Sequence, residues 1–243
     1  MAVSFFEGFV DRLNEALRGF PCRPPVSHIY HPLDYARRPF LQYCRNYARR
    51  RGQVMLLGMN PGPWGMAQTG VPFGAVAMVR DWLRIDAAVG KPPCEHPKRP
   101  VDGFRCDRNE VSGMRLWGWA QATFVTPETF FSRFFVYNYC PLLFLEETGR
   151  NRTPDKLPAS QRDALLQTCD DSLRELVAYM NPARVIGIGT FAQKRAIGAL
   201  GDVEPAVGRI LHPSPASPAA NRDWAGTVTR QLQAMEIDGL IEG

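Results

Sequence analysis

The sequence predicts an α/β fold of three layers, α/β/α, with a short central parallel sheet. Short apolar runs alternate with amphipathic helical patterns along the chain, and loops rich in glycine and proline follow several of these runs. Strands that alternate with helices form a parallel sheet with helices on both faces. Of the 243 residues, 45% are hydrophobic, which is enough for the core of a domain of this size. We therefore expect one domain over residues 1–243.

The predicted elements follow from spacing and composition. The first helix carries apolar residues at helical spacing and ends before Gly19 and Pro21. At the last helix, Ser217 suits the N-cap and Pro218 suits the first helical position. Strands are expected at 54–57, 134–137, 184–188 and 207–211, where the apolar runs have the length of buried parallel strands. Helices are expected at 3–18, 34–51, 75–89, 160–180, 190–200 and 219–236, with a proline-rich connector after the first and an irregular insertion at 91–108.

Composition narrows the classes of protein that fit. The formal charge is +5 and the sequence pI is about 9.0, which suits a polyanionic partner but does not require one. The six cysteines are spread along the chain without a CxxC pair, so a zinc site, a redox pair or an iron–sulfur cluster is not indicated. We expect reduced thiols, no metal and no cofactor.

The chain also lacks the marks of a membrane or secreted protein. No stretch is long and apolar enough to span a bilayer, and the first 20 residues lack a basic segment followed by an apolar run. The arginines at 37–38 and 49–51 fit a solvated helix face better than a nuclear address. We expect a soluble intracellular monomer, in the cytoplasm or nucleoid of a bacterium or in the nucleus of a eukaryote.

Three polar residues follow predicted strands, where open parallel sheets bind their ligands. Asn60 stands among glycines and prolines, which would let the backbone approach a planar base closely. Asn138 offers a donor and an acceptor together, as the edge of a flipped base requires. His212 directly follows the last strand. Each has a structural alternative: a loop whose aromatic residues plug the core, a turn residue, and a packed histidine.

Taken in order, several segments resemble one known family. The segments are 58–63 (GMNPGP), 65–74 (GMAQTGVPFG), 111–113 (VSG), 138–144 (NYCPLLF), 149–151 (GRN) and 212–215 (HPSP). They are similar to the single-strand-selective monofunctional uracil-DNA glycosylases, within the uracil-DNA glycosylase superfamily, and the similarity runs from about Pro39 to about Gly239. HPSP alone carries little weight, whereas the ordered set is specific. The resemblance implies the superfamily's fold and an enzyme that flips uracil, and 5-hydroxymethyluracil, out of DNA and hydrolyses the N-glycosidic bond, leaving an abasic site.

The resemblance also implies roles in a base pocket. Asn60 would position the attacking water, and His212 would donate a hydrogen bond to the uracil O2. A donor aimed at O2 stabilises the charge on the leaving base, typically by about 10²–10³ in rate. The implied substrate-binding residues are Met59, Gly62, Met66, Phe73, which would stack on the base, and Asn138, which would bind its edge. Gly62 would leave room at the pyrimidine C5, and the absence of lysine from the main motif segments argues against a lyase step.

Two segments resemble the family's DNA-contacting residues. They are Arg150, Asn151, Arg152 and Lys156, and the proline-stiffened finger Ser214, Pro215, Ala216 and Ser217. The basic side chains would bind phosphates without base specificity, although an ordinary solvated loop has the same composition. Animal members carry Arg and Asn where this chain has Ala216 and Ser217, so the finger has less side chain to fill the gap left by a flipped base. The implied partner is DNA with uracil or an oxidised pyrimidine, single- or double-stranded.

Three other interpretations remain open. Residues 187–192 (GIGTFA) could be a dinucleotide-binding loop, but they lack the third glycine of GxGxxG, and close packing of a strand on a helix explains the two glycines better. A non-enzymatic DNA-binding protein would need the basic surface, but not Asn60, Asn138 and His212 together. Removal of a deaminated purine from the same pocket is the nearest alternative.

Overall fold

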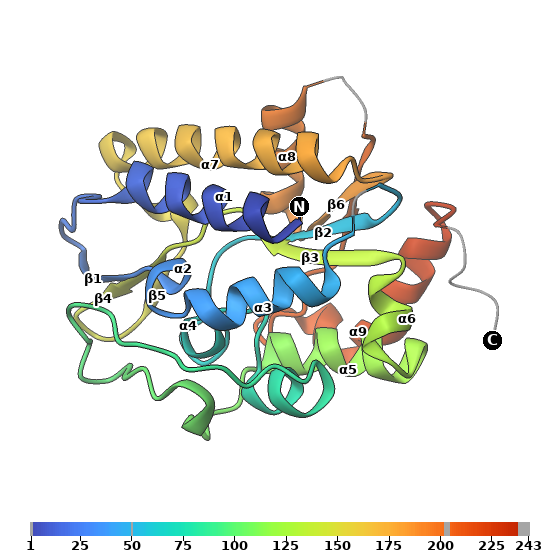
Figure 1. The fold of residues 1–243 in the computed structure, drawn as a ribbon, viewed down its shortest axis with the longest axis horizontal. Helices are drawn as coiled ribbons and strands as arrows, with labels where there is room; N and C mark the ends of the chain where they lie inside the picture. Colours follow the sequence, from blue (N-terminus) through green and yellow to red (C-terminus); the bar gives the residue numbers. More distant parts are fainter. Residues whose placement is uncertain (1, 50, 202–204, 238–243) are drawn as a thin grey trace.

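The centre of the computed structural model is a four-stranded parallel sheet, in the order β3-β2-β6-β7 (Figure 1). Its strands are β2 (Val54–Gly58), β3 (Phe134–Asn138), β6 (Arg184–Ile188) and β7 (Val207–Ile210). The structure describes residues 2–49, 51–201 and 205–237. Every residue of β2 and β3 is buried, as expected for strands with helices on both faces. The predicted α/β fold and its four parallel strands are confirmed.

Helices lie on both sides of this sheet (Figure 1). On one side are α1 (Ala2–Leu17), α7 (Ala159–Met180) and α8 (Thr190–Leu200), and on the other are α5 (Val111–Phe124), α6 (Pro127–Phe131) and α9 (Pro218–Gln233). The short helices α2 (Pro32–Tyr35) and α4 (Met66–Thr69) lie in connecting segments. At the last helix, the Ser217 hydroxyl accepts a hydrogen bond from the Ala220 amide, and Pro218 is in the first turn. The predicted start of this helix is confirmed.

Helix α3 (Arg37–Tyr47) closes the β3 edge of the sheet. The buried Tyr43 hydroxyl donates to the Val136 carbonyl, 2.8 Å away, and accepts from the Val136 amide at 3.2 Å. An edge strand exposes backbone donors and acceptors that another chain could pair with. Tyr43 satisfies two of these groups from a helix.

The predicted helix over 34–51 is divided and shorter in the structure. Ala36 has non-helical backbone angles and separates α2 from α3. Helix α3 ends at Tyr47 because the buried Gln53 side chain donates to the Tyr47 carbonyl, at 3.0 Å, and accepts from the Arg49 amide, at 2.7 Å. Residue 50 lies outside the described residues. A side chain beyond the helix therefore ends it, which apolar spacing alone does not indicate.

The predicted helix over 75–89 was also too long. It contains a π-helical segment, Met78–Trp82, and stops near Arg84, which has a positive φ of 54°. Residues with this backbone conformation do not continue a right-handed helix. The insertion at 91–108 is irregular as predicted, apart from one 3₁₀ turn at Gly103–Arg105.

A second, antiparallel sheet was not predicted. Its order is β1-β4-β5, formed by β1 (Val26–Tyr30), β4 (Leu143–Glu146) and β5 (Asn151–Arg152). Strand β1 lies within the proline-rich connector and pairs with β4, more than 100 residues later, so that Tyr30 faces Leu143. Such short strands are defined by tertiary pairing rather than by local pattern.

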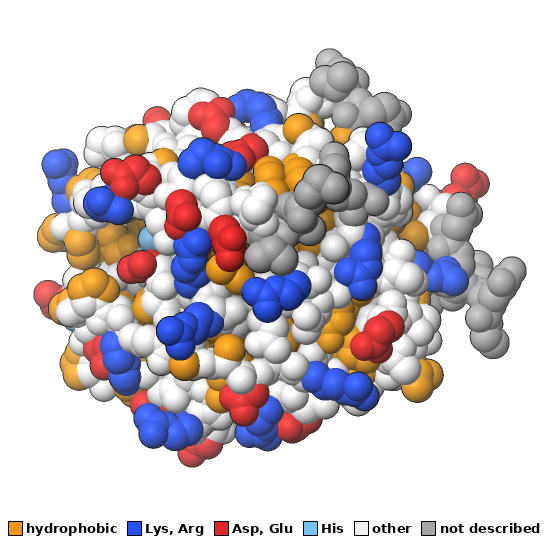
Figure 2. All heavy atoms as spheres, in the orientation of Figure 1, with side chains coloured by type: hydrophobic (Ala, Val, Ile, Leu, Met, Phe, Trp, Pro, Cys, Tyr) orange, Lys and Arg blue, Asp and Glu red, His pale blue; other side chains and the backbone are white. Residues whose placement is uncertain are grey.

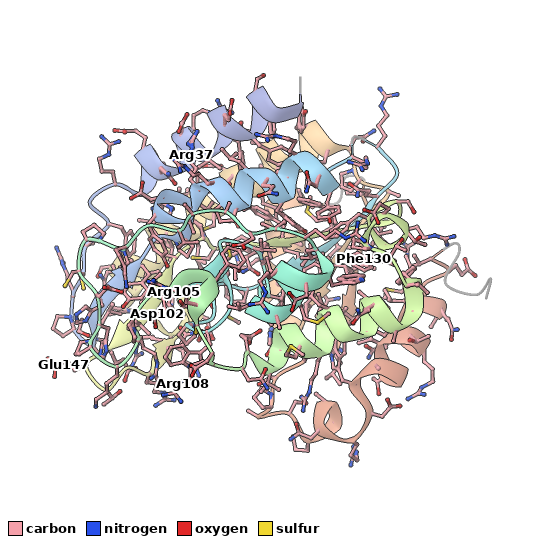
Figure 3. The ribbon with its side chains drawn as sticks, turned by 60° about the horizontal axis from the view of Figure 1, so that its bottom comes forward. Arg37, Asp102, Arg105, Arg108, Phe130 and Glu147 are labelled. Carbon is pink, nitrogen blue, oxygen red and sulfur yellow. The ribbon has the colours of Figure 1, made fainter. Side chains whose placement is uncertain are left out.

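An aromatic cluster fixes α5 against the sheet. Its members are Trp82, Trp117, Trp119, Phe124, Phe130, Phe131 and Phe134, all buried. Figure 3 shows Phe130 at the end of the molecule where α5 and α6 meet. Aromatic side chains bury large apolar areas and pack in defined geometries. The cluster therefore gives α5 a fixed position, and the first turn of this helix reaches the site described below.

The face that carries α1 and α3 has Lys and Arg side chains interspersed with Asp and Glu (Figure 2). Several of these side chains form ion pairs, such as Arg37 with Asp11. The positive charge of the chain is therefore not gathered on this face. Within the described ranges, no helix is both long and apolar enough to cross a membrane, and no three His, Cys, Asp or Glu side chains form a group that could hold a metal ion.

Candidate active site

A cavity of about 370 Å³ opens beyond the carboxyl ends of the central strands. This is a volume typical of small-ligand pockets. Its lining residues are Met59, Asn60, Gly62, Pro63, Met66, Phe73, Glu110, Ser112, Asn138, Asn151, Thr153, His212 and Ser214. All seven residues expected to catalyse or bind the base therefore line one cavity, together with Asn151 and Ser214 from the two expected DNA-contacting segments.

Asn138 supplies an unused hydrogen-bond acceptor at this cavity. It is the last residue of β3, opposite Gly58 of β2, and only 3% of its surface is exposed. Its Nδ2 donates to the Met66 sulfur, 3.2 Å away, whereas its Oδ1 is buried without a partner among the described residues. A buried polar atom without a partner costs about 1–3 kcal/mol. A ligand that donates to Oδ1 would recover this free energy.

Two glycines create the space that the polar side chains occupy. A Cβ at Gly58 would lie 2.3 Å from the Asn138 Oδ1 and 2.6 Å from the Phe73 ring. A Cβ at Gly189, which has a positive φ of 91°, would lie 3.1 Å from the His212 Cβ. Larger residues at these positions would displace the groups that line the cavity. Gly187 instead packs against α8, since its Cβ would lie 2.2 Å from the Gln193 amide nitrogen, which confirms the packing interpretation of that glycine.

Phe73 presents its ring to the cavity from an unusual backbone conformation. Its φ is +54°, and 9% of the residue is exposed. The Phe73 carbonyl accepts hydrogen bonds from the Trp117 indole, at 3.0 Å, and from the Ala75 amide, at 2.8 Å. Gly113 of α5 lets the helix approach the Phe73 carbonyl, because a Cβ at Gly113 would lie 2.0 Å from its oxygen. The aromatic core thus holds the ring through α5.

Asn60 lies two residues beyond β2 and is half-buried. Its Nδ2 donates to the Leu142 carbonyl, 3.2 Å away. This bond fixes the amide so that the Nδ2 is engaged with the protein and the Oδ1 can accept from another group. An amide oxygen can accept a hydrogen bond but cannot act as a strong base.

His212 follows β7 by two residues and is half-buried. Its ring centroid lies 6.1 Å from that of Phe73, at an angle of 45°. Burial lowers the pKa of His212 from 6.5 to about 4, because a charged imidazole loses hydration there. The ring is therefore neutral at physiological pH and can donate one hydrogen bond.

The loop of 58–74 is held by its own polar residues. The buried Gln68 donates to the carbonyls of Pro63 and Pro100, both at 2.9 Å, and accepts from the amides of Asp102 and Gly103. All of its hydrogen-bonding groups are used, and they connect this loop to the insertion. Trp64 does not plug the core, because it is half-buried with the guanidinium groups of Arg99 and Arg108 over its ring, at 5.1 and 5.4 Å.

The finger at 214–217 is held by hydrogen bonds from residues of α5 and α9. Arg115 of α5 donates to the carbonyls of Pro213 and Ser214, at 3.2 and 3.3 Å, and to the Asn221 side chain at 2.9 Å. Asn221 in turn donates to the Pro215 carbonyl. Ser214 lines the cavity, whereas Pro215, Ala216 and Ser217 lie outside its lining, with Pro215 and Ala216 exposed. Arg115 was missed from the sequence, since an arginine in a helix carries no signal for this role.

The residues of the expected phosphate-binding segment differ in their contacts with the rest of the protein. Arg150 and Lys156 are exposed. Arg152 pairs with Glu146 at 2.9 Å and donates to the Lys156 carbonyl at 2.7 Å. Asn151 turns inward, and its buried Oδ1 has no partner in the described part of the chain. The structure therefore leaves Arg150 and Lys156 available to a ligand, while Arg152 is engaged with the protein.

Sequence reasoning also missed Glu110 as a cavity residue. It caps α5, where its carboxylate accepts from the amide of Ser112, at 3.3 Å, and from that of Gly113. Burial raises the pKa of Glu110, and these two amide bonds oppose the shift. The only signal in the sequence was its place directly before the 111–113 segment.

Together these features define an α/β protein that can hold a planar, hydrogen-bonding base between a stacking ring and a buried amide, at the carboxyl edge of its sheet. Residues 45–233 match the model of the uracil-DNA glycosylase superfamily. The chain belongs to that superfamily.

Named relatives extend the match to nearly the whole chain. A single-strand selective monofunctional uracil-DNA glycosylase of Rattus norvegicus is 47% identical over 99% of this chain and 88% of its own length. Proteins of the same description from Mus musculus and Bos taurus are 47% and 46% identical, each over 98% of this chain. The crystal structure of wild-type Pedobacter heparinus SMUG2 superposes with a TM-score of 0.65 over 94% of this chain and 97% of that one, at 17% identity. That last likeness supports the fold alone.

Proposed function

We propose that this protein is a monofunctional uracil-DNA glycosylase that removes uracil from DNA and leaves an abasic site. The observation that carries the proposal is the buried Asn138 amide, which faces the same cavity as Phe73, Asn60 and His212. The near full-length similarity to monofunctional uracil-DNA glycosylases supports it.

Base selection rests on the two ends of the Asn138 amide. Uracil presents a donor at N3 and an acceptor at O4, whereas cytosine presents an acceptor at N3 and a donor at its amino group. The unpartnered Oδ1 accepts from the uracil N3–H, and the Nδ2 donates to O4. Cytosine would place an acceptor against Oδ1. The Phe73 ring stacks on the extruded base.

Catalysis rests on stabilising the leaving base and on placing water. Breaking the N-glycosidic bond leaves negative charge on uracil and positive charge on the sugar. The neutral His212 imidazole donates to O2, where the negative charge develops. The Asn60 Oδ1 orients the attacking water while its Nδ2 remains on the Leu142 carbonyl. No lysine lines the cavity, so the described lining offers no amine for a Schiff base.

DNA binds across the rim of the cavity. Arg150 and Lys156 contact phosphates on one side, with Asn151 and Arg152 placing the segment, and the finger of Ser214, Pro215, Ala216 and Ser217 lies against the gap left by the base. Both single- and double-stranded DNA are substrates, and the protein acts as a monomer. The space beside Gly62 also admits an oxidised pyrimidine such as 5-hydroxymethyluracil.

The test is the product formed on a defined oligonucleotide. Purified protein should convert a uracil-containing strand into one that breaks only after alkali treatment, and should leave the matched cytosine strand intact. Breakage without alkali would contradict the monofunctional assignment. If the uracil strand is untouched by the parent protein, the proposed function is wrong.

A further inference from the structure

The proposed function does not explain why the Glu110 carboxylate lines the cavity. In this cavity the reaction places negative charge on the leaving base. Two like charges in a partly buried site repel each other. An acidic side chain there opposes catalysis unless it serves another purpose.

Helix capping does not by itself account for a glutamate at this position. Ser, Thr, Asp and Asn are the preferred N-cap residues, because their short side chains reach the free amides of the first turn. Thr126 caps α6 in this way. Glu110 caps α5 with a longer side chain, and it also lines the cavity. Each carboxylate oxygen has two acceptor sites, and one amide bond to each leaves capacity for another donor.

The carboxylate lies across the space that glycines leave in the first motif loop. A Cβ at Gly62 would lie 3.8 Å from the Glu110 Oε1 and 3.9 Å from its Cγ, which is ordinary contact distance. A Cβ at Gly65 would lie 2.8 Å from the same Cγ. Glu110 comes shortly after Asp102, Arg105 and Arg108 in the chain, and Figure 3 shows these three residues near one another. The space beside Gly62 therefore ends at a carboxylate.

We infer that Glu110 is a specificity-determining residue, whose carboxylate accepts a hydrogen bond from a hydroxyl group on the C5 substituent of the extruded pyrimidine. This inference rests on the proposed function, with the C5 edge of the base directed toward Gly62. A C5 methyl group offers no donor and would remove water from the carboxylate, which is unfavourable. A C5 carboxylate would meet a like charge. Glu110 thus selects among pyrimidines by the chemistry of C5, whereas Asn138 reads the N3 and O4 edge.

The experiment compares three bases in one single-stranded sequence: uracil, 5-hydroxymethyluracil and 5-carboxyuracil. Single-turnover excision rates are measured for the parent, for Glu110→Gln and for Glu110→Asp. Gln keeps the length and one capping acceptor but loses the charge, while Asp keeps the charge and withdraws it from the cavity. Thr126→Ala, which removes the cap of α6, is the control for a loss of helix capping alone. Thermal unfolding is followed for each variant.

The rate on each modified base is divided by the rate on uracil for the same protein, so partial unfolding cancels. Hydrogen bonds to charged groups exceed neutral ones by about 1 kcal/mol, so Glu110→Gln should lower the 5-hydroxymethyluracil ratio about fivefold. Removal of the like charge should raise the 5-carboxyuracil ratio about tenfold or more. Glu110→Asp should lower the first ratio, and Thr126→Ala should change neither.

Ratios within twofold of the parent in both Glu110 variants would mean that Glu110 only caps α5, and the inference would fail. If the Glu110 variants lose about 10²-fold or more of the excision rate on all three bases, the carboxylate acts on cleavage of the glycosidic bond. That result would also overturn the inference. A parent protein that leaves uracil in place would refute the proposed function instead, which separates the two failures.

Discussion

The floor and the rim of the cavity differ in how far the protein has fixed their side chains in advance. At the floor, Asn138 and Met66 are 3% and 2% exposed, and each contacts the other. We call the rim the segments 150–156 and 214–217, which contain the lining residues Asn151 and Ser214, and in it Arg150, Lys156 and Ala216 are exposed. Groups held in place before the ligand arrives need no reorganisation in the reaction, whereas exposed charges act through screened, long-range attraction. Substitutions in the cavity should therefore change excision on every substrate, whereas those at the rim should change DNA binding or the extraction of a paired base.

The largest expected effect is the loss of Asn60 or His212, two half-buried residues of the cavity lining. Asn60→Ala and His212→Ala should each lower single-turnover uracil excision by about 10²-fold or more, because in the proposed mechanism one group acts on the water and the other on the leaving base. DNA affinity, measured by fluorescence anisotropy, should stay within a few-fold of the parent. Excision within a few-fold of the parent in both variants would show that neither residue acts on the bond.

Asn138→Asp should have the next largest effect. The change removes the donor to the uracil O4 and buries a charge beside Met66, and we expect uracil excision to fall about 10²-fold, since a site built around a hydrogen bond rejects a base that leaves its groups unpaired. We expect a trace of cytosine excision, because the acceptor suits the cytosine amino group. Matched uracil and cytosine oligonucleotides measure both. Unchanged uracil excision would remove Asn138 from base reading.

At the rim, Ala216→Arg should have an effect that depends on the substrate. Extracting a paired base costs a few kcal/mol, part of which an inserted side chain can offset. We expect excision from a U·A duplex to rise about fivefold, with U·G rising less and single-stranded uracil least. The three rates are measured at one salt concentration, since an added Arg also strengthens phosphate binding. An equal rise on all three would mean that charge alone had acted.

The smallest expected effect separates two neighbouring arginines. Arg150→Ala should lower the slope of log affinity against log salt concentration by about one, because an exposed Arg that neutralises a phosphate releases one counterion. Arg152→Ala should change the slope less, since Arg152 already pairs with Glu146. Affinities from 50 to 200 mM salt measure both slopes. Equal reductions would mean that Arg152 leaves Glu146 to bind DNA.

The central sheet could be predicted from the sequence because its signal is local. Strands β2 and β3 are fully buried runs, β6 is buried after its first residue, and β7 is a shorter run in which Ile210 alone is buried. The helix start at Ser217 has its own residue pattern. Strand β1 could not be found in this way. Its five residues, Val26–Tyr30, become a strand only by pairing with β4. The end of α3 depends on Gln53, a side chain that lies outside the helix.

The candidate site was predictable where it follows strand ends and the first motif, as with Asn60, Asn138 and His212. The groups that support it were not. Arg115 holds the finger, and Glu110 reaches the cavity, because α5 is packed in one orientation by a distant aromatic cluster. Neither residue stands in a pattern that distinguishes it from a surface charge. The roles of the individual site residues and the single-domain organisation stay predictions.

The backbone of Phe73 sets a limit on how far this protein could be stabilised. A non-glycine residue in the left-handed region costs roughly 1–2 kcal/mol, and Phe73 has a φ of +54°. Trp117 and Ala75 hold that conformation in place. A search for heat-resistant variants would favour relaxation at this position, since strained functional sites are where stability and activity oppose each other. The relaxed chain would melt at a higher temperature and would have lost the ring that the proposed function places against the base.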